Sequence, residues 1–247
     1  MSKSEENTTD IQRRKVLVAG AAAAGVTLVP GVMMIEVAQA KPDAESASRS
    51  VRWGMLIDSN KCKSGCDDCV SACGKENGWA KDKTPMSQKP QWMRKVNLKH
   101  KATGKEASLP MMCQHCEKPP CVDVCPTGAS FKRTDGIVLV DKHTCIGCRY
   151  CMMACPYKAR SFVHEVIEDH DSYMPRGMGT VESCTMCVHR VDKGELPACV
   201  ESCKEKAILF GDLNDPNSDI AKRLKEYPSR QIRADLRLNT GVSYEGI

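Results

Sequence analysis

Sixteen cysteines, arranged in four short groups, constrain this 247-residue chain more than any other feature of its sequence. Every group holds four cysteines, and its last two are separated by three residues. An enzyme of the cytosol rarely carries so many thiols unless they bind metal, and secreted disulfide scaffolds are usually far shorter. We call the groups quartets one to four: Cys62, Cys66, Cys69 and Cys73; Cys113, Cys116, Cys121 and Cys125; Cys145, Cys148, Cys151 and Cys155; Cys184, Cys187, Cys199 and Cys203.

The third quartet has the spacing of a bacterial iron–sulfur loop. It reads C-x2-C-x2-C-x3-C-P, completed by Pro156, and Cys125-Pro126 repeats this ending in the second quartet. Three thiolates close in sequence wrap one face of an iron–sulfur cube, while the remote fourth cysteine reaches the other cluster of a pair. At four thiolates per cube, the sixteen cysteines predict four [4Fe–4S] clusters.

If the fourth ligands cross over in this way, the cysteines divide into four ligand sets. The second and third quartets then share one two-cluster module. The first and fourth share another by analogy, because Gly74 and Lys204 stand where proline is expected. The predicted sets are set A (Cys113, Cys116, Cys121 and Cys155), set B (Cys145, Cys148, Cys151 and Cys125), set C (Cys62, Cys66, Cys69 and Cys203) and set D (Cys184, Cys187, Cys199 and Cys73).

The segments around the quartets predict an α+β fold of two pseudo-symmetric ferredoxin modules with irregular inserts. Short apolar runs at 55–58 and 138–141 each end in an aspartate four residues before a quartet, and both are typical of buried strands. A turn signal at 134–136 predicts a hairpin over 130–140, and 207–210 is a further strand candidate. The inner module would span 113–155, and the outer module 52–73 plus 184–210.

Two alternatives to iron–sulfur clusters stay open at this point. Structural zinc is also held by four cysteines, although usually as paired CxxC knuckles rather than quartets that end in C-x3-C-P. Eight disulfides in an exported protein are the second alternative, and the closeness of the cysteines within each quartet argues against them. Zinc and disulfides both predict a colourless protein, whereas iron–sulfur clusters would make it brown.

The remaining residues show no substrate site. The sequence contains no phosphate-binding glycine loop, nucleophile elbow or paired-carboxylate motif, so no catalytic residue is predicted. The lysine-rich segment 74–112 is expected to be a solvated loop, with a docking face as the alternative. His115 is expected to donate to a cluster sulfur, and Arg149 to raise a cluster potential or to be a solvated surface residue. The chain has a net charge of +5, but its sequence shows no stripe of basic residues interleaved with aromatic ones. The charge therefore does not indicate nucleic-acid binding.

Residues 1–40 read as a twin-arginine (Tat) signal peptide. Arg13 and Arg14 precede an uncharged run over 16–35, and Ala38-Gln39-Ala40 is a small-residue cleavage pattern. A mature chain of 41–247 would form the four-cluster domain. The alternative is an uncleaved anchor, because about 20 apolar residues can span a bilayer.

The quartets and their flanks resemble the four-cluster iron–sulfur subunits of dimethyl sulfoxide, tetrathionate and polysulfide reductases. The resemblance rests on CQHCEKPPC at 113–121, CIGCRYCMMACPYKARSF at 145–162 and CTMCVHR at 184–190. Within this family, KCKSGCDDCVSACGKENGW at 61–79, PRGMGTVESC at 175–184 and GDLNDPNS at 211–218 look most like DsrO, the exported subunit of DsrMKJOP complexes.

That resemblance implies an electron-transfer subunit without a substrate site of its own. It would relay electrons between a membrane quinone/cytochrome module and a partner redox subunit in dissimilatory sulfur metabolism. The implied partners are an integral-membrane quinone-interacting subunit and a multihaem cytochrome c, at the periplasmic face of the cytoplasmic membrane. The segment 227–247 would be a docking extension. The alternative is the β subunit of an exported molybdopterin reductase of tetrathionate, polysulfide or thiosulfate type.

Overall fold

The computed structural model describes residues 47–247, apart from residues 86, 105 and 169. The predicted signal peptide and its cleavage site therefore lie outside the described residues. The strands are β1 (Trp53–Asp58), β2 (Met93–Lys99), β3 (Glu106–Met112), β4 (Ser130–Lys132), β5 (Val138–Val140), β6 (Ser161–Phe162), β7 (Val181–Glu182), β8 (Ile208–Asp212), β9 (Ser229–Arg230) and β10 (Val242–Glu245). The helices are α2 (Asp68–Glu76), α3 (Pro120–Asp123), α4 (Tyr150–Ala154), α5 (Val188–Val191), α6 (Ala198–Glu201) and α7 (Asp219–Glu226), with 3-10 turns η3 (Trp79–Lys81) and η4 (Ala234–Leu236).

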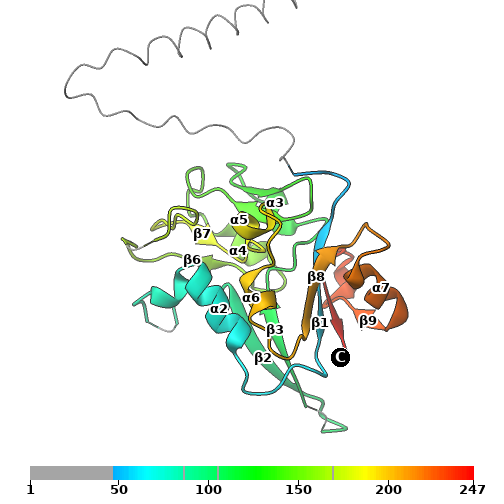
Figure 1. The fold of residues 1–247 in the computed structure, drawn as a ribbon. Coiled ribbons are helices and arrows are strands. Elements are labelled where there is room, and N and C mark those ends of the chain that lie inside the picture. Colours follow the sequence, from blue (N-terminus) through cyan, green and yellow to red (C-terminus); the bar gives the residue numbers. More distant parts are fainter. Residues whose placement is uncertain (1–46, 86, 105, 169) are drawn as a thin grey trace, which may run out of the picture. The chain divides into compact units, whose positions relative to one another are not determined.

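A four-stranded sheet joins the two ends of the described chain in the order β8-β1-β10-β9 (Figure 1). Strand β1 pairs antiparallel with β8 and parallel with β10, so it lies inside the sheet. Helix α7 packs against β8 and β1, and its N-terminus is capped by Ser218, whose hydroxyl accepts from the Ala221 amide at 3.2 Å. Gly211 permits this contact, because a Cβ there would lie 2.9 Å from the Ile220 side chain.

The strands predicted next to the quartets are confirmed. The run at 55–58 lies within β1, and that at 138–141 coincides with β5 plus one residue. The predicted hairpin over 130–140 is the antiparallel pair β4–β5, and Gly136 at its turn has a φ of +88°. The candidate at 207–210 is β8, shifted by one residue and extended to Asp212. Short sheets with small helices between them make this an α+β fold of ferredoxin type, as predicted.

The expectation of a solvated loop over 74–112 was wrong. Strands β2 and β3 form a long hairpin in this segment, paired from Met93–Met112 to Lys99–Glu106. Figure 1 shows the far end of the hairpin projecting from the lower edge of the molecule. Its near end is buried, because Trp92, Met93 and Leu109 are each about 1% exposed. Strand β2 continues from this buried start into Arg94, Lys95 and Lys99, so the basic composition of the segment concealed its inward face.

The end of the segment 227–247, which was expected as a docking extension, is part of the folded core. Strand β10 lies between β1 and β9, and Val242 and Tyr244 are fully buried. The Tyr244 hydroxyl donates to the Pro110 carbonyl oxygen at 3.1 Å, which ties the tail to β3. A strand that is paired on both edges is not a free extension, so the expectation was wrong for β10.

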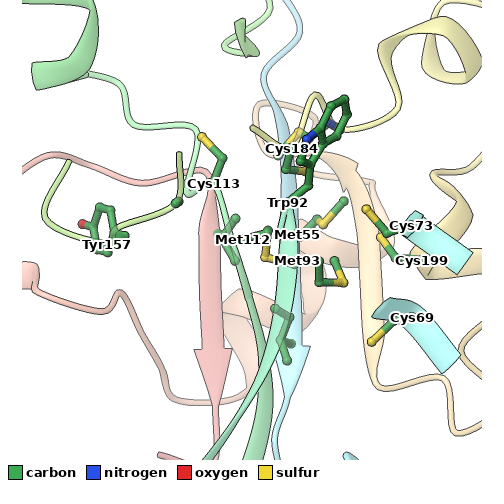
Figure 2. Packing of buried hydrophobic residues seen from close by; sticks show 14 of the residues in the cluster. Met55, Cys69, Cys73, Trp92, Met93, Met112, Cys113, Tyr157, Cys184 and Cys199 are labelled. Carbon is green, nitrogen blue, oxygen red and sulfur yellow. Dashed lines mark hydrogen bonds between the residues drawn. The ribbon is translucent and has the colours of Figure 1, made fainter. Parts of the chain in front are cut away.

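Methionine, tryptophan and cysteine fill the core, which compensates for the few aromatic residues of the chain. Figure 2 shows Met55, Met93 and Met112 between cysteines on either side, with Trp92 near Cys184. One contiguous cluster of buried residues includes cysteines of all four quartets. Flexible thioether side chains adapt well to such irregular spaces. In the part of the chain that the structure describes, no helix is long and apolar enough to cross a membrane.

Candidate metal centre

The cysteines of predicted set B line one cavity. The loop between β5 and α4 supplies Cys145 and Cys148, α4 supplies Cys151, and Cys125 follows α3. Gly147 makes this loop possible, because its φ is +71° and a Cβ there would collide with the Gly179 carbonyl oxygen. Cys148 is the exposed thiol among the sixteen, so this cavity reaches the protein surface.

The cysteines of predicted set C line a second cavity. Cys62 and Cys66 belong to the loop between β1 and α2, Cys69 to the first turn of α2, and Cys203 follows α6. Lys95 of β2 also lines this cavity, and its Nζ lies 2.9 Å from the Cys62 Sγ. Each of the two cavities is therefore lined by three cysteines from one quartet and a fourth from another.

The cysteines of sets A and D gather in the interior. The pKa of Cys116 is raised to about 12, first by burial and then by the neighbouring thiols of Cys121 and Cys155. The pKa of Cys184 is raised well above its ordinary value, first by burial and then by three thiols. Those three belong to Cys73, Cys199 and Cys187. Figure 2 shows Cys73 and Cys199 pointing to the same space between their helices.

Backbone amides point at several of these thiols. The amides of Ser130, Met186 and Ala207 donate to the sulfurs of Cys125, Cys184 and Cys203 at 3.4, 3.4 and 3.3 Å. Donors of this kind stabilise a thiolate more than a neutral thiol. The buried thiols are nevertheless protonated when no metal is bound, because burial raises their pKa values. Metal binding would supply the positive charge that displaces their protons.

A buried arginine contacts two of the sets. Arg160 is 5% exposed, and its Nη2 donates to the Cys121 Sγ at 3.1 Å. Burial raises the pKa of Cys151, and the same guanidinium opposes that rise. Arg160 therefore lies beside Cys121 of set A and Cys151 of set B.

Three buried N–H groups near set A have no partner in the described part of the chain. The Nδ1 of His115 accepts from the Val138 amide at 3.0 Å, so the proton of the neutral ring is on Nε2. That Nε2 is unsatisfied, as are Nε and Nη1 of Arg160. The pKa of His115 is lowered to about 3, first by burial and then by Arg160, so the ring is neutral. Buried donors without acceptors fit a group that brings its own acceptors, such as sulfide.

The residues suit a cluster by their donor chemistry. Within the described ranges, no three His, Cys, Asp or Glu side chains converge where a single metal ion would bind. The thiolates of a cube each hold a different iron, so such convergence is not required of them. Sulfur-only donor sets select iron–sulfur clusters, zinc or copper(I) over hard cations.

Comparison with known proteins decides between these metals. Residues 105–213 match the family model described as a 4Fe-4S dicluster domain. The Hdr-like menaquinol oxidoreductase iron–sulfur subunit 1 of Archaeoglobus fulgidus is 42% identical over 94% of this chain and 97% of its own. The B subunit of tetrathionate reductase from Salmonella typhimurium is 39% identical, over 81% of this chain and 75% of its own. The chain belongs to this family of iron–sulfur subunits.

This iron–sulfur protein carries several [4Fe–4S] clusters and transfers electrons within an oxidoreductase. The predicted resemblance and cofactor type are confirmed. The role of each cysteine as an iron ligand stays a prediction, although the structure brings together the members of each predicted set.

The sequence did not reveal the cations near the cysteines. Lys95 is one of many lysines in its segment, and Arg160 stands five residues after Cys155, within the run 145–162, where its spacing does not mark it as a neighbour of a thiol. Arg149, which the sequence left as either a tuning cation or a solvated surface residue, has its guanidinium carbon 3.8 Å from the centroid of the Phe162 ring. The carbonyl oxygens of Lys63 and Cys66 accept from the Lys95 Nζ at 3.2 and 2.8 Å. Only the fold reveals such contacts.

Proposed function

We propose that sets A, B, C and D each hold one [4Fe–4S] cluster and that the four form an electron path. The grouping of the thiols carries this proposal, because every set combines three cysteines of one quartet with a fourth from another. When bound, each cluster takes up and passes on one electron. The protein residues hold the thiolates in place, exclude water and set the local charge.

Short helices link the sets in pairs. Helix α2 bears Cys69 of set C and Cys73 of set D, and α4 bears Cys151 of set B, next to Cys155 of set A. Cys121 and Cys125 flank the end of α3 in the same way. Buried cysteines of sets A, C and D also belong to one core cluster. A rigid helix that bears ligands of two sets fixes the separation of their clusters.

The pseudo-symmetric arrangement of two modules is also part of the proposal. The outer module would consist of β1, quartet one and α2, together with quartet four, α6 and β8. The inner module would consist of β5, quartet three and α4, together with quartet two, α3 and β4. The antiparallel pairs β1–β8 and β4–β5, and the helix contacts α2–α6 and α3–α4, support this correspondence.

For the assembly, we propose a relay between a membrane quinone/cytochrome module and a partner redox subunit in dissimilatory sulfur metabolism. The Archaeoglobus fulgidus relative is named as a subunit of a menaquinol oxidoreductase, and the match extends over nearly all of both chains. We further propose export by the signal peptide 1–40 and peripheral attachment of 41–247 at the periplasmic face. The exposed Cys148 would place the set B cluster nearest to a partner.

The second candidate is the β subunit of an exported molybdopterin reductase. The match to the tetrathionate reductase protein favours it, although the match covers less of each chain. Gentle solubilisation of membranes and purification through a C-terminal tag would separate the two candidates. Co-purification with a multihaem cytochrome and a polytopic membrane subunit supports the relay. Recovery with a molybdopterin subunit instead would replace the first candidate by the second.

A further inference from the structure

Arg160 is a buried positive charge without a carboxylate partner in the described part of the chain. Arg176, another deeply buried arginine, pairs with both Asp82 and Glu182. Arg160 contacts thiols instead, through the hydrogen bond from Nη2 to the Cys121 Sγ. An uncompensated buried charge is strongly unfavourable, so the surroundings of Arg160 must become anionic in the working protein.

The position of Arg160 makes its charge act on two sets at once. Its guanidinium opposes the burial-driven rise in the pKa of Cys113 and of Cys121 in set A. Cys151 of set B packs in the same buried cluster as Cys121, the acceptor of the Arg160 hydrogen bond, and the guanidinium also opposes the rise in its pKa. Nε and Nη1, both buried, have no acceptor from the described residues. A planar guanidinium has five N–H donors, so it can donate hydrogen bonds to two anionic groups on different sides.

We propose that Arg160 tunes the reduction potentials of two clusters together, those held by sets A and B. This inference rests on the proposed ligand sets. Reduction of a cluster adds one negative charge, and a nearby fixed positive charge stabilises the reduced form more than the oxidised form. Arg160 therefore raises both potentials, and its unsatisfied N–H groups donate to sulfur atoms of the clusters.

Lys95 is a second cation that contacts a thiol, and it lies beside set C, so it can serve as a control for Arg160. Its Nζ donates to the Cys62 Sγ of set C and to two backbone carbonyl oxygens, so its three donors are all engaged near one set. By the same electrostatic reasoning, Lys95 raises the potential of the set C cluster alone. The chain therefore offers a control that changes one cation beside a thiol without touching sets A and B.

The test is a redox titration of the purified full-length subunit, or of the complex that contains it, followed by electron paramagnetic resonance. Arg160→Gln removes the charge and keeps a polar side chain. Two of the four midpoint potentials should fall, with at least a tenfold lower ratio of reduced to oxidised cluster at a fixed potential, about 59 mV for one electron. Lys95→Gln should lower one midpoint potential, and that one should belong to neither of the two.

Arg160→Lys keeps the charge and serves as the second variant if Arg160→Gln loses iron. A single ammonium cannot replace the donors that the guanidinium directs at both sets, so at least one of the same two midpoints should fall below its wild-type value while the other two midpoints stay unchanged. Unchanged midpoints at full iron content, or equal shifts in all four, would overturn the proposal. A wild-type protein that does not titrate as four clusters would instead overturn the ligand sets on which it rests.

Discussion

The Arg176 guanidinium and the Glu182 carboxylate form a two-bond ion pair inside the protein. Nε lies 3.0 Å from one carboxylate oxygen and Nη2 lies 2.6 Å from the other. The same guanidinium donates to Asp82 and to the Gly78 carbonyl oxygen. Both carboxylates are buried, so the three side chains depend on one another. The network fastens the segment after α2 to strand β7.

Arg176→Met should therefore be strongly destabilising, because it leaves the buried Asp82 carboxylate without this counterion and leaves Glu182 with only the more distant Lys142 Nζ, at 4.0 Å. Loss of one partner of a buried pair costs about 3–5 kcal/mol, which lowers the melting temperature of a protein of this size by on the order of 10 °C. The temperature at which visible cluster absorbance disappears measures this. The control is Arg233→Met, which removes an exposed pair with Asp235 and should shift that temperature by only a few degrees.

The buried tail gives a second prediction. The Tyr244 hydroxyl donates to the Pro110 carbonyl oxygen and accepts from Gln114 Nε2 at 3.2 Å. Tyr244→Phe keeps the ring but removes both bonds, and Gln114 Nε2 retains only its bond to the Met112 carbonyl oxygen, so the change should cost about 1–3 kcal/mol of stability. Tyr227→Phe, at a partly exposed position, is the control and should be almost neutral. Equal effects of the two changes would mean that the tail contributes little to the core.

The loop around set B depends on a glycine for space as well as for conformation. Gly147→Ala should lose part of its iron, because the new Cβ would collide with the Gly179 carbonyl. Gly194 has a similar positive φ of +78°, and no atom lies within 4 Å of the place that a Cβ would take there. Gly194→Ala therefore carries the backbone strain without the collision and should keep its full iron content. Iron and sulfide analysis of both variants checks this difference.

Export is predicted to need both arginines of the leader. Replacement of Arg13 and Arg14 by lysine should leave the protein in the cytoplasm, because the Tat pathway reads the arginine pair. Fractionation of cells followed by immunoblotting measures the distribution. If the doubly substituted chain reaches the periplasm as well as the wild type does, the Tat assignment is wrong.

Local patterns predicted the strands and the cysteine quartets, because each depends on neighbours in sequence. Strands β1 and β5 follow from apolar runs next to a quartet, and β4–β5 follows from its turn. The hairpin β2–β3 was missed because its lysines disguise a buried face. The position of β10 was missed because a parallel pair with β1 joins residues about 190 apart, as in Met55 and Val242. The contact of Arg160 with Cys121 was missed because it forms only when quartets two and three fold together.

The ligand sets are the central claim, and a comparison of three cysteine variants tests them most directly. Each of Cys116→Ser, Cys148→Ser and Cys155→Ser is purified and its clusters are observed by electron paramagnetic resonance during a redox titration. Cys155→Ser should alter the same signal as Cys116→Ser, because both residues belong to set A, although Cys155 lies in the quartet of Cys148. If Cys155→Ser instead alters the signal that Cys148→Ser alters, the fourth ligands do not cross over, and the proposed sets are wrong.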